Sequence, residues 1–376
     1  MSVTGSLVGR SAELRVLEDA LARLDGGRAQ AVELVGPAGI GKTRLLAALG
    51  ERAESRGHLV LFGSGAELER ELPFWVFVDA LDEYLEGLEP RRLARLGADT
   101  RGELAKLLPS FSRAAGPPSG TLHERYRTHR AVRELLEHLA ATRPLVLALD
   151  DFQWADSASI DLVVALLHRP PAARVLLALG SRRRQLPAPL ATALERALRA
   201  GTLARVELGP LTREQTGELL GRGGDDPLTA AFYEETGGNP FYLEQLARAP
   251  GRWLDAAPWG PDVLLAGVAV PPMVAAALAE ELAMLSVSVR SVLDGASVAG
   301  DPFELDLAAI AAAAPEPAAR DAVDVLLRLD LVRSTDMPRR FRFRHPIVRR
   351  AVYEATAGGW RLGAHERIAQ RLAERG

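Results

Sequence analysis

Residues 36–43 read Gly-Pro-Ala-Gly-Ile-Gly-Lys-Thr, which is a full match to the pattern G-x-x-x-x-G-K-[ST]. In such a loop the glycines let backbone N–H groups close around a polyphosphate, the lysine reaches the β- and γ-phosphates, and the threonine hydroxyl binds Mg²⁺. The short, largely apolar segment 31–35 favours a strand before the loop, and residues 43–51 favour a helix whose amino end faces the anion. This order predicts an α/β domain of the P-loop type.

The use of lysine supports this prediction. The chain has 46 Lys and Arg residues, and only Lys42 and Lys106 are lysines. A chain that uses arginine for nearly every cation thus has lysine where the phosphate motif needs one. The alternative is a glycine-rich turn that matches by chance, and the flanking strand and helix argue against it.

A second motif follows about a hundred residues later. Residues 145–149 form a continuous apolar run that ends in Asp150-Asp151, as expected for a strand buried on both faces. We expect Asp150 to hold Mg²⁺ and Asp151 to orient or deprotonate the attacking water, the positioning that phosphoryl transfer needs. Taken alone, the pattern also fits an ordinary strand before a turn. Asp156 is expected to cap the next helix.

Three arginines, residues 182–184, follow the predicted strand 174–179. The carboxyl ends of parallel strands line the ligand crevice of an open sheet, so an arginine there could sense the γ-phosphate. We select Arg183 for this role, and a solvated basic turn remains an equal alternative.

The length and the pattern of the chain predict several domains. A chain of 376 residues is too long for one ordinary domain. Buried strands alternate with helices up to about residue 210, which predicts a parallel sheet covered on both faces. Helices followed by two short strands, residues 331–334 and 340–343, suggest a winged helix. The expected domains are a P-loop domain at 1–210, a small helical domain with linker at 211–261, a winged-helix domain at 262–356 and the start of a helical region at 357–376. Ser11 is expected to cap a helix over residues 12–24.

Composition excludes several classes of function. The chain has no cysteine, which excludes disulfides, thiol catalysis and zinc–thiolate sites. Its formal charge of −3 lacks the basic balance of a nucleic-acid-binding chain. The uncharged stretch Val263–Ala279 contains Pro271-Pro272 and is read as a connection into a buried helix rather than a membrane span. With no signal segment at the amino end, we expect a soluble, cytoplasmic protein.

Five segments occur in a fixed order along the chain. They are LVGR (7–10), GPAGIGKT (36–43), LALDDFQWAD (147–156), TGGNPFYLEQL (236–246) and FRFRHPIVRRAVYE (341–354). Together they resemble the nucleotide-binding core of the STAND class of P-loop ATPases, and more narrowly the large ATP-binding regulators of the LuxR type. The resemblance extends from residue 6 to about residue 370.

The resemblance implies which residues bind ATP or ADP with Mg²⁺. Thr43 and Asp150 would be the metal ligands, and Lys42 would act with the two aspartates and Arg183 in hydrolysis. Pro240 would pack against the base or ribose. His345 would contact the β-phosphate of ADP, although a capping or core-edge histidine is the alternative reading. The remaining nucleotide-binding residues would be Val8, Gly9 and Arg10 near the adenine, and Gly36, Pro37, Ala38, Gly39, Ile40, Gly41 and Arg44 in and beside the loop.

The chain departs from the family pattern at two points. Gln153 stands where the family often has histidine, which leaves a water-positioning role there open. Family members usually continue into a helical-repeat sensor and a DNA-binding helix-turn-helix, whereas this sequence stops at Gly376. We therefore expect the core of such a regulator without those regions.

The expected function is an ATP/ADP switch with slow ATP hydrolysis. The implied partners are adenine nucleotide and an inducer or regulatory protein, and nucleotide-dependent self-association is left open. One alternative is an AAA+ ATPase that acts on DNA through the winged helix. Its expected recognition helix, residues 317–329, has nearly balanced charge, so we expect no direct DNA binding by this chain. The other alternative is a small-molecule phosphotransferase, for which no second-substrate motif is found.

Overall fold

The computed structural model describes residues 7–66, 69–111, 122–182, 185–249 and 269–374 of the chain. It divides into two compact units. One unit runs from Arg10 to Gly209, and the other combines Met1–Gly9 with Pro210–Gly376. We call them the nucleotide unit and the helical unit. In the described residues, no helix is both long and apolar enough to span a membrane.

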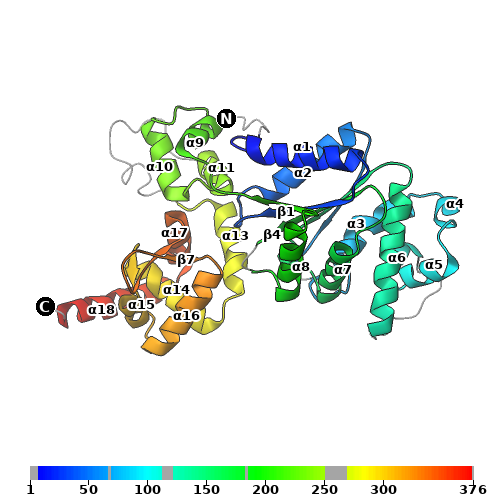
Figure 1. Cartoon of the computed structure of the whole chain (residues 1–376). Helices are drawn as coiled ribbons and strands as arrows, with labels where there is room; N and C mark the ends of the chain where they lie inside the picture. Colours follow the sequence, from blue (N-terminus) through cyan, green and yellow to red (C-terminus); the bar gives the residue numbers. More distant parts are fainter. Residues whose placement is uncertain (1–6, 67–68, 112–121, 183–184, 250–268, 375–376) are drawn as a thin grey trace. The chain divides into compact units, whose positions relative to one another are not determined.

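The nucleotide unit is built on a parallel five-stranded sheet with the strand order β2-β3-β4-β1-β5. Helices α1 and α2 cover one face, and α3, α6, α7 and α8 pack on the other (Figure 1). The elements are α1 Ser11–Asp25, β1 Gln30–Val35, α2 Lys42–Ser55, β2 Leu59–Ser64, α3 Trp75–Glu86, α4 Pro90–Leu93, α5 Ala98–Leu104, η2 Pro109–Phe111, α6 Leu122–Ala140, β3 Leu145–Asp150, η3 Phe152–Trp154, α7 Ser157–His168, β4 Val175–Ser181, α8 Ala188–Arg199 and β5 Leu203–Glu207.

The predicted fold class is confirmed by this sheet. Every residue of β1, β3 and β4 is buried, as expected for strands covered on both faces. The register pairs Val35 with Ser181 and Ser64 with Asp150, so the carboxyl ends of the strands meet at one edge. The loop after β1 and the acids at the end of β3 therefore lie at the same edge.

The expected capping role of Ser11 is wrong. The N-cap of α1 is Arg10, and it makes no side-chain capping hydrogen bond; Ser11 is the first helical residue. The side chain of Arg10 is used elsewhere, as described below. Asp156, in contrast, caps α7 as predicted, because its side chain accepts a hydrogen bond from the N–H of Ser159.

The helical unit consists of helices and a small antiparallel sheet with the order β6-β8-β7. The sequence indicated β7 and β8 but not β6, which has only two residues and is defined by its pairing with β8. The elements are α9 Arg213–Leu220, α10 Pro227–Thr236, α11 Pro240–Arg248, α13 Pro272–Ala283, α14 Val287–Ala299, β6 Phe303–Glu304, α15 Leu305–Ala311, α16 Glu316–Arg328, β7 Val332–Ser334, β8 Arg340–Phe343, α17 Pro346–Ala355 and α18 Gly358–Glu374.

Candidate nucleotide-binding site

The glycine-rich loop joins β1 to α2 and depends on its glycines. Gly39 and Gly41 have φ values of 72° and 104°, in the left-handed region that favours glycine. A Cβ atom at Gly36 would lie 2.7 Å from Cγ2 of Ile40 and 3.1 Å from the carbonyl oxygen of Leu208. Side chains at these positions would therefore change the loop.

The amino end of α2 suits an anion. Its N-cap is Gly41, which makes no side-chain capping bond, and its first turn contains no acidic residue. The helix dipole and the N–H groups of the first turn favour negative charge at this end. Lys42, the first helical residue, is 6 % exposed, and its Nζ donates to the carbonyl oxygens of Gly36 at 3.1 Å and Pro37 at 3.0 Å. The lysine thus folds over the loop.

Thr43 and Asp150 are brought together as the motifs predict. The hydroxyl of Thr43 donates to Oδ2 of Asp150 at 2.5 Å, joining α2 to the end of β3. Oδ1 of the same carboxylate accepts the N–H of Asp151 at 2.8 Å. Gly180 on the neighbouring strand β4 makes room for it, because a Cβ atom there would overlap Asp150 Oδ1.

The pKa of Asp150 is raised above its ordinary value. Burial of the carboxyl is the largest cause, and the nearby charge of Asp151 adds to it. The hydrogen bond from Thr43 and the charge of Lys42 act in the opposite direction. A cation beside a buried carboxylate stabilises its charged form. Asp150 is therefore suited to bind a metal ion.

Asp151 and Gln153 form the turn after β3. Asp151 has φ 45° and ψ 38°, a left-handed conformation that is uncommon for a residue other than glycine. Nε2 of Gln153 donates to Oδ1 of Asp151 at 2.8 Å, and its Oε1 accepts the N–H of Arg182 at 3.2 Å. Gln153, whose role the sequence left open, therefore links the second acid to the end of β4. Arg183, the predicted sensor, lies outside the described residues.

The sequence did not predict a buried ion pair between Glu33 of β1 and Arg205 of β5 in the same sheet. Glu33 of β1 is fully buried, and Oε2 accepts from Nε of Arg205 at 2.7 Å. Its Oε1 accepts from the hydroxyl of Ser181 at 3.4 Å. The sequence feature that could have indicated this ion pair is an acidic residue within an otherwise apolar strand.

Arg10 is the one member of the predicted adenine-contacting group that belongs to the nucleotide unit. Its side chain contacts the phosphate loop through the carbonyl oxygen of Ile40. Val8 and Gly9 belong to the helical unit. Gly9 has φ 69°, and a Cβ atom there would lie 2.5 Å from the side chain of Gln215, so Gly9 packs against the start of α9.

Pro240 and His345 also belong to the helical unit. Pro240 begins α11, directly after the N-cap Asn239. His345 is the N-cap residue of α17 and is 7 % exposed. Its ring lies edge-on to Tyr242 with 5.8 Å between centroids, and a Cβ atom at Gly237 would overlap its Nδ1. Burial, followed by the charge of Arg344, lowers the pKa of His345 to about 3, so the imidazole is neutral at pH 7.

The residues at the loop fit magnesium and a nucleotide. In the described parts of the chain no group of three or more His, Cys, Asp or Glu side chains could hold a metal ion by itself. Mg²⁺ in nucleotide sites is usually held by one or two protein oxygens together with phosphates and water. The hydroxyl of Thr43 and the carboxylate of Asp150 are such oxygens.

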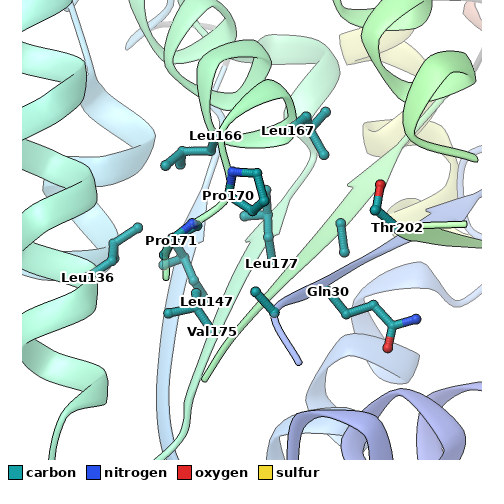
Figure 2. Close-up of a pocket in the computed structure, with 12 residues that line it drawn as sticks. Gln30, Leu136, Leu147, Leu166, Leu167, Pro170, Pro171, Val175, Leu177 and Thr202 are labelled. Carbon is teal, nitrogen blue, oxygen red and sulfur yellow. The ribbon is translucent and has the colours of Figure 1, made fainter. Parts of the chain in front are cut away.

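A cavity of about 40 Å³ lies near the opposite edge of the sheet, at the amino ends of the strands. Figure 2 shows apolar side chains that converge on it from α6, α7 and the neighbouring strands, with Gln30 as a polar member. Its volume is far below the roughly 300–1,000 Å³ of small-molecule sites. The cavity is therefore too small for a nucleotide. Its position at the amino ends of the strands separates it from the phosphate loop.

Comparisons with known proteins agree with this geometry. Residues 6–179 match the family model described as AAA ATPase domain. An uncharacterized protein of Rhizobium meliloti (strain 1021) is 25% identical over 393 residues. That alignment includes 97% of this chain and 37% of the relative, so the chain spans little more than a third of the relative's length.

Two solved structures align with nearly the whole chain. One is a STAND protein with a tetratricopeptide repeat sensor from Pyrococcus horikoshii, at 15% identity and a TM-score of 0.36, covering 98% of this chain and 45% of that one. The other is Cdc6p from Pyrobaculum aerophilum, at 13% identity and a TM-score of 0.43, covering 99% and 97%. Residues 6–179 are therefore similar in sequence to AAA ATPase domains, and the loop geometry is consistent with that similarity.

Proposed function

We propose that the chain is an ATP/ADP-binding signal-transduction switch with slow ATP hydrolysis. In this proposal Lys42 neutralises phosphate charge, Thr43 and Asp150 hold Mg²⁺, and Asp151 orients the attacking water. Bound Mg²⁺ would neutralise charge on the phosphates. Arg183 is proposed as the γ-phosphate sensor. Gly36 to Gly41 and Arg44 would surround the phosphates.

The observation that carries the proposal is the hydrogen bond of 2.5 Å between Thr43 and Asp150. This bond joins two residues that are 107 positions apart in the sequence, and one of them follows Lys42 directly; it supports their proposed role as metal ligands. If the phosphate-loop motif and the acidic strand end were chance matches, there would be no physical reason for their side chains to meet in this way. Phosphoryl transfer needs mainly positioning and charge neutralisation, which these groups can supply.

A switch requires that ATP and ADP make different contacts in two states. We propose that His345 contacts the β-phosphate of ADP and that Pro240 packs against the base or ribose. Because the pKa of His345 is lowered to about 3, such a contact would be a hydrogen bond from a neutral imidazole rather than an ion pair. We also propose adenine contacts by Val8, Gly9 and Arg10.

We further propose that the chain is the core of a transcriptional regulator of the LuxR type. The ordered motifs of the sequence support this assignment, with an inducer or regulatory protein as partner and self-association controlled by nucleotide. Direct DNA binding by α16 is disfavoured, because Glu316 pairs with Arg320 at 3.0 Å and with Arg339 at 2.9 Å. The charge of Arg320 is therefore compensated within the helix.

Calorimetry on the folded full chain tests the proposal. We expect magnesium-dependent binding of ATP and ADP, and phosphate release slower than about one turnover per second, below the usual enzyme range. Lys42→Ala should weaken ATP binding at least about tenfold, because a charged hydrogen-bonding partner of the phosphates is lost. Lys106→Ala is the matched control, since this second lysine pairs with Glu103 on α5. Absence of magnesium-dependent nucleotide binding in the folded wild type would overturn the proposal.

A further inference from the structure

Arg10 lies where the chain enters the nucleotide unit, and its guanidinium joins three parts of that unit. Nη2 donates to the carbonyl oxygen of Ile40 at 3.1 Å and to that of Gly209 at 2.8 Å. Nη1 donates to Oε1 of Glu13 at 3.0 Å. Arg10 is only 5 % exposed. One planar group therefore connects the start of α1, the phosphate loop and the last residue of the unit.

The contact with Ile40 restrains the loop. The C=O and N–H of a trans peptide point in opposite directions, so holding the carbonyl of Ile40 fixes the direction of the N–H of Gly41. Gly41 has a left-handed backbone and immediately precedes α2. The direction of such N–H groups decides whether a loop can bind an anion. Arg10 thus supports the loop from outside it.

The contact with Gly209 reaches the other end of the unit. The N–H of Leu208 donates to the carbonyl oxygen of Val35 at 2.8 Å, and the carbonyl oxygen of Leu208 would lie 3.1 Å from a Cβ atom at Gly36. The segment that leaves β5 therefore packs against the first residue of the loop. The chain enters the unit at Arg10 and leaves it after Gly209, and one side chain holds both points.

We propose that Arg10 is a positioning residue that holds the phosphate loop in its binding form and couples nucleotide occupancy of the loop to the segment that leaves the unit at Gly209. The inference rests on the proposed nucleotide binding and deepens it. A nucleotide that orders the loop also orders the carbonyl of Ile40, and the same guanidinium transmits that restraint to Gly209. This role is separate from contact with the adenine.

Substitution of Arg10 in the full chain tests the coupling. Arg10→Ala should weaken magnesium–ADP binding about tenfold, since two hydrogen bonds from a charged donor to the loop and the exit segment are lost. Arg10→Lys should give an intermediate loss and provides the readout if the alanine variant does not fold, because an ammonium lacks the planar fork.

Arg205→Lys is the control for altering a buried arginine in this unit. Arg205 binds Glu33 and Glu195, each at 2.7 Å. The control should lower thermal stability while leaving ADP affinity within about twofold of the wild type, as expected for an independent site.

Hydrogen exchange separates coupling from a general structural role. In the wild type, saturating magnesium–ADP should slow exchange of the backbone amides of residues 207–209, 211 and 212, whereas the Arg10 variants at equal nucleotide occupancy should lose this protection. If the wild type binds ADP but the Arg10 variants bind it equally well, or keep the protection, this inference alone is wrong. If the folded wild type does not bind nucleotide, the proposed function fails as well.

Discussion

At the scale of single residues, burial decides what each ionisable group can do. Asp150 and His345 are both nearly buried, and burial moves their pKa values in opposite directions. The pKa of the carboxyl is raised, so a neighbouring cation is favoured. The pKa of the imidazole is lowered to about 3, so the imidazole is neutral at pH 7. The sequence named both residues but could not indicate these environments.

His345 should make the helical unit sensitive to acid. Its pKa is lowered to about 3 in the folded state, against 6.5 for an ordinary histidine. Below pH 6.5 the unfolded chain therefore binds a proton that the folded chain does not. Stability is lost as the pH falls from about 6.5 towards 3, by at most about 1.4 kcal/mol per pH unit from this residue. Urea denaturation followed by circular dichroism between pH 5.0 and 7.5 measures the slope.

His345→Gln should flatten this slope, because the amide does not titrate. His365→Gln is the control, since His365 is exposed in the same unit. Equal slopes for the wild type and His345→Gln would show that the histidine does not govern acid stability.

At the scale of elements, the site depends on how closely neighbouring strands approach. The run of apolar residues before Asp150 was enough to predict β3, and the register of the sheet then placed its end beside β4. The requirement for glycine at position 180 was not predictable, because it arises from a side chain on another strand. β6 was missed for the same kind of reason, since only pairing with β8 defines it.

Gly180→Ala should impair the proposed magnesium site more than the fold. A Cβ atom at this position would overlap Oδ1 of Asp150 and displace the carboxylate from Thr43. We expect magnesium-dependent ATP affinity to fall at least about tenfold, which corresponds to about 1.4 kcal/mol. Calorimetry at saturating and zero magnesium measures the effect.

Gly102→Ala on α5 is the matched control. A Cβ atom there would meet no atom within 4 Å, so the substitution should stabilise the helix by about 0.5–1 kcal/mol and leave affinity unchanged. If Gly180→Ala retained wild-type magnesium dependence, the close approach of β4 to Asp150 would have no functional role.

At the scale of the whole molecule, the two units have separate hydrophobic cores. One core lies among β1 to β5 and the helices around them, whereas another joins α13, α14, α16 and α17 with the small sheet. A single two-state unfolding transition is therefore not expected for this chain. Ligand binding should act first on the unit that contains the phosphate loop.

Magnesium–ADP at about 100 times its dissociation constant should stabilise the nucleotide unit by about 2.7 kcal/mol. For a unit of about 200 residues this corresponds to a rise of about 5–10 °C in its melting temperature. Scanning calorimetry measures the shift, and Lys42→Ala, with affinity at least about tenfold weaker, should reduce it to about half or less at the same ADP concentration. An unchanged transition at saturating ADP would contradict nucleotide binding by this unit.

The amino-acid sequence alone was enough to predict the P-loop, the acidic strand end and the parallel α/β class. These features depend on local patterns, because a phosphate loop needs glycine and lysine at fixed spacing and a doubly buried strand must be apolar throughout. The contacts of Arg10, Gln153 and Glu33, in contrast, could be seen only in the folded chain. Each of these side chains binds a partner brought near by the fold of the sheet and its loops, and partners between 2 and 199 residues away leave no common pattern in the sequence.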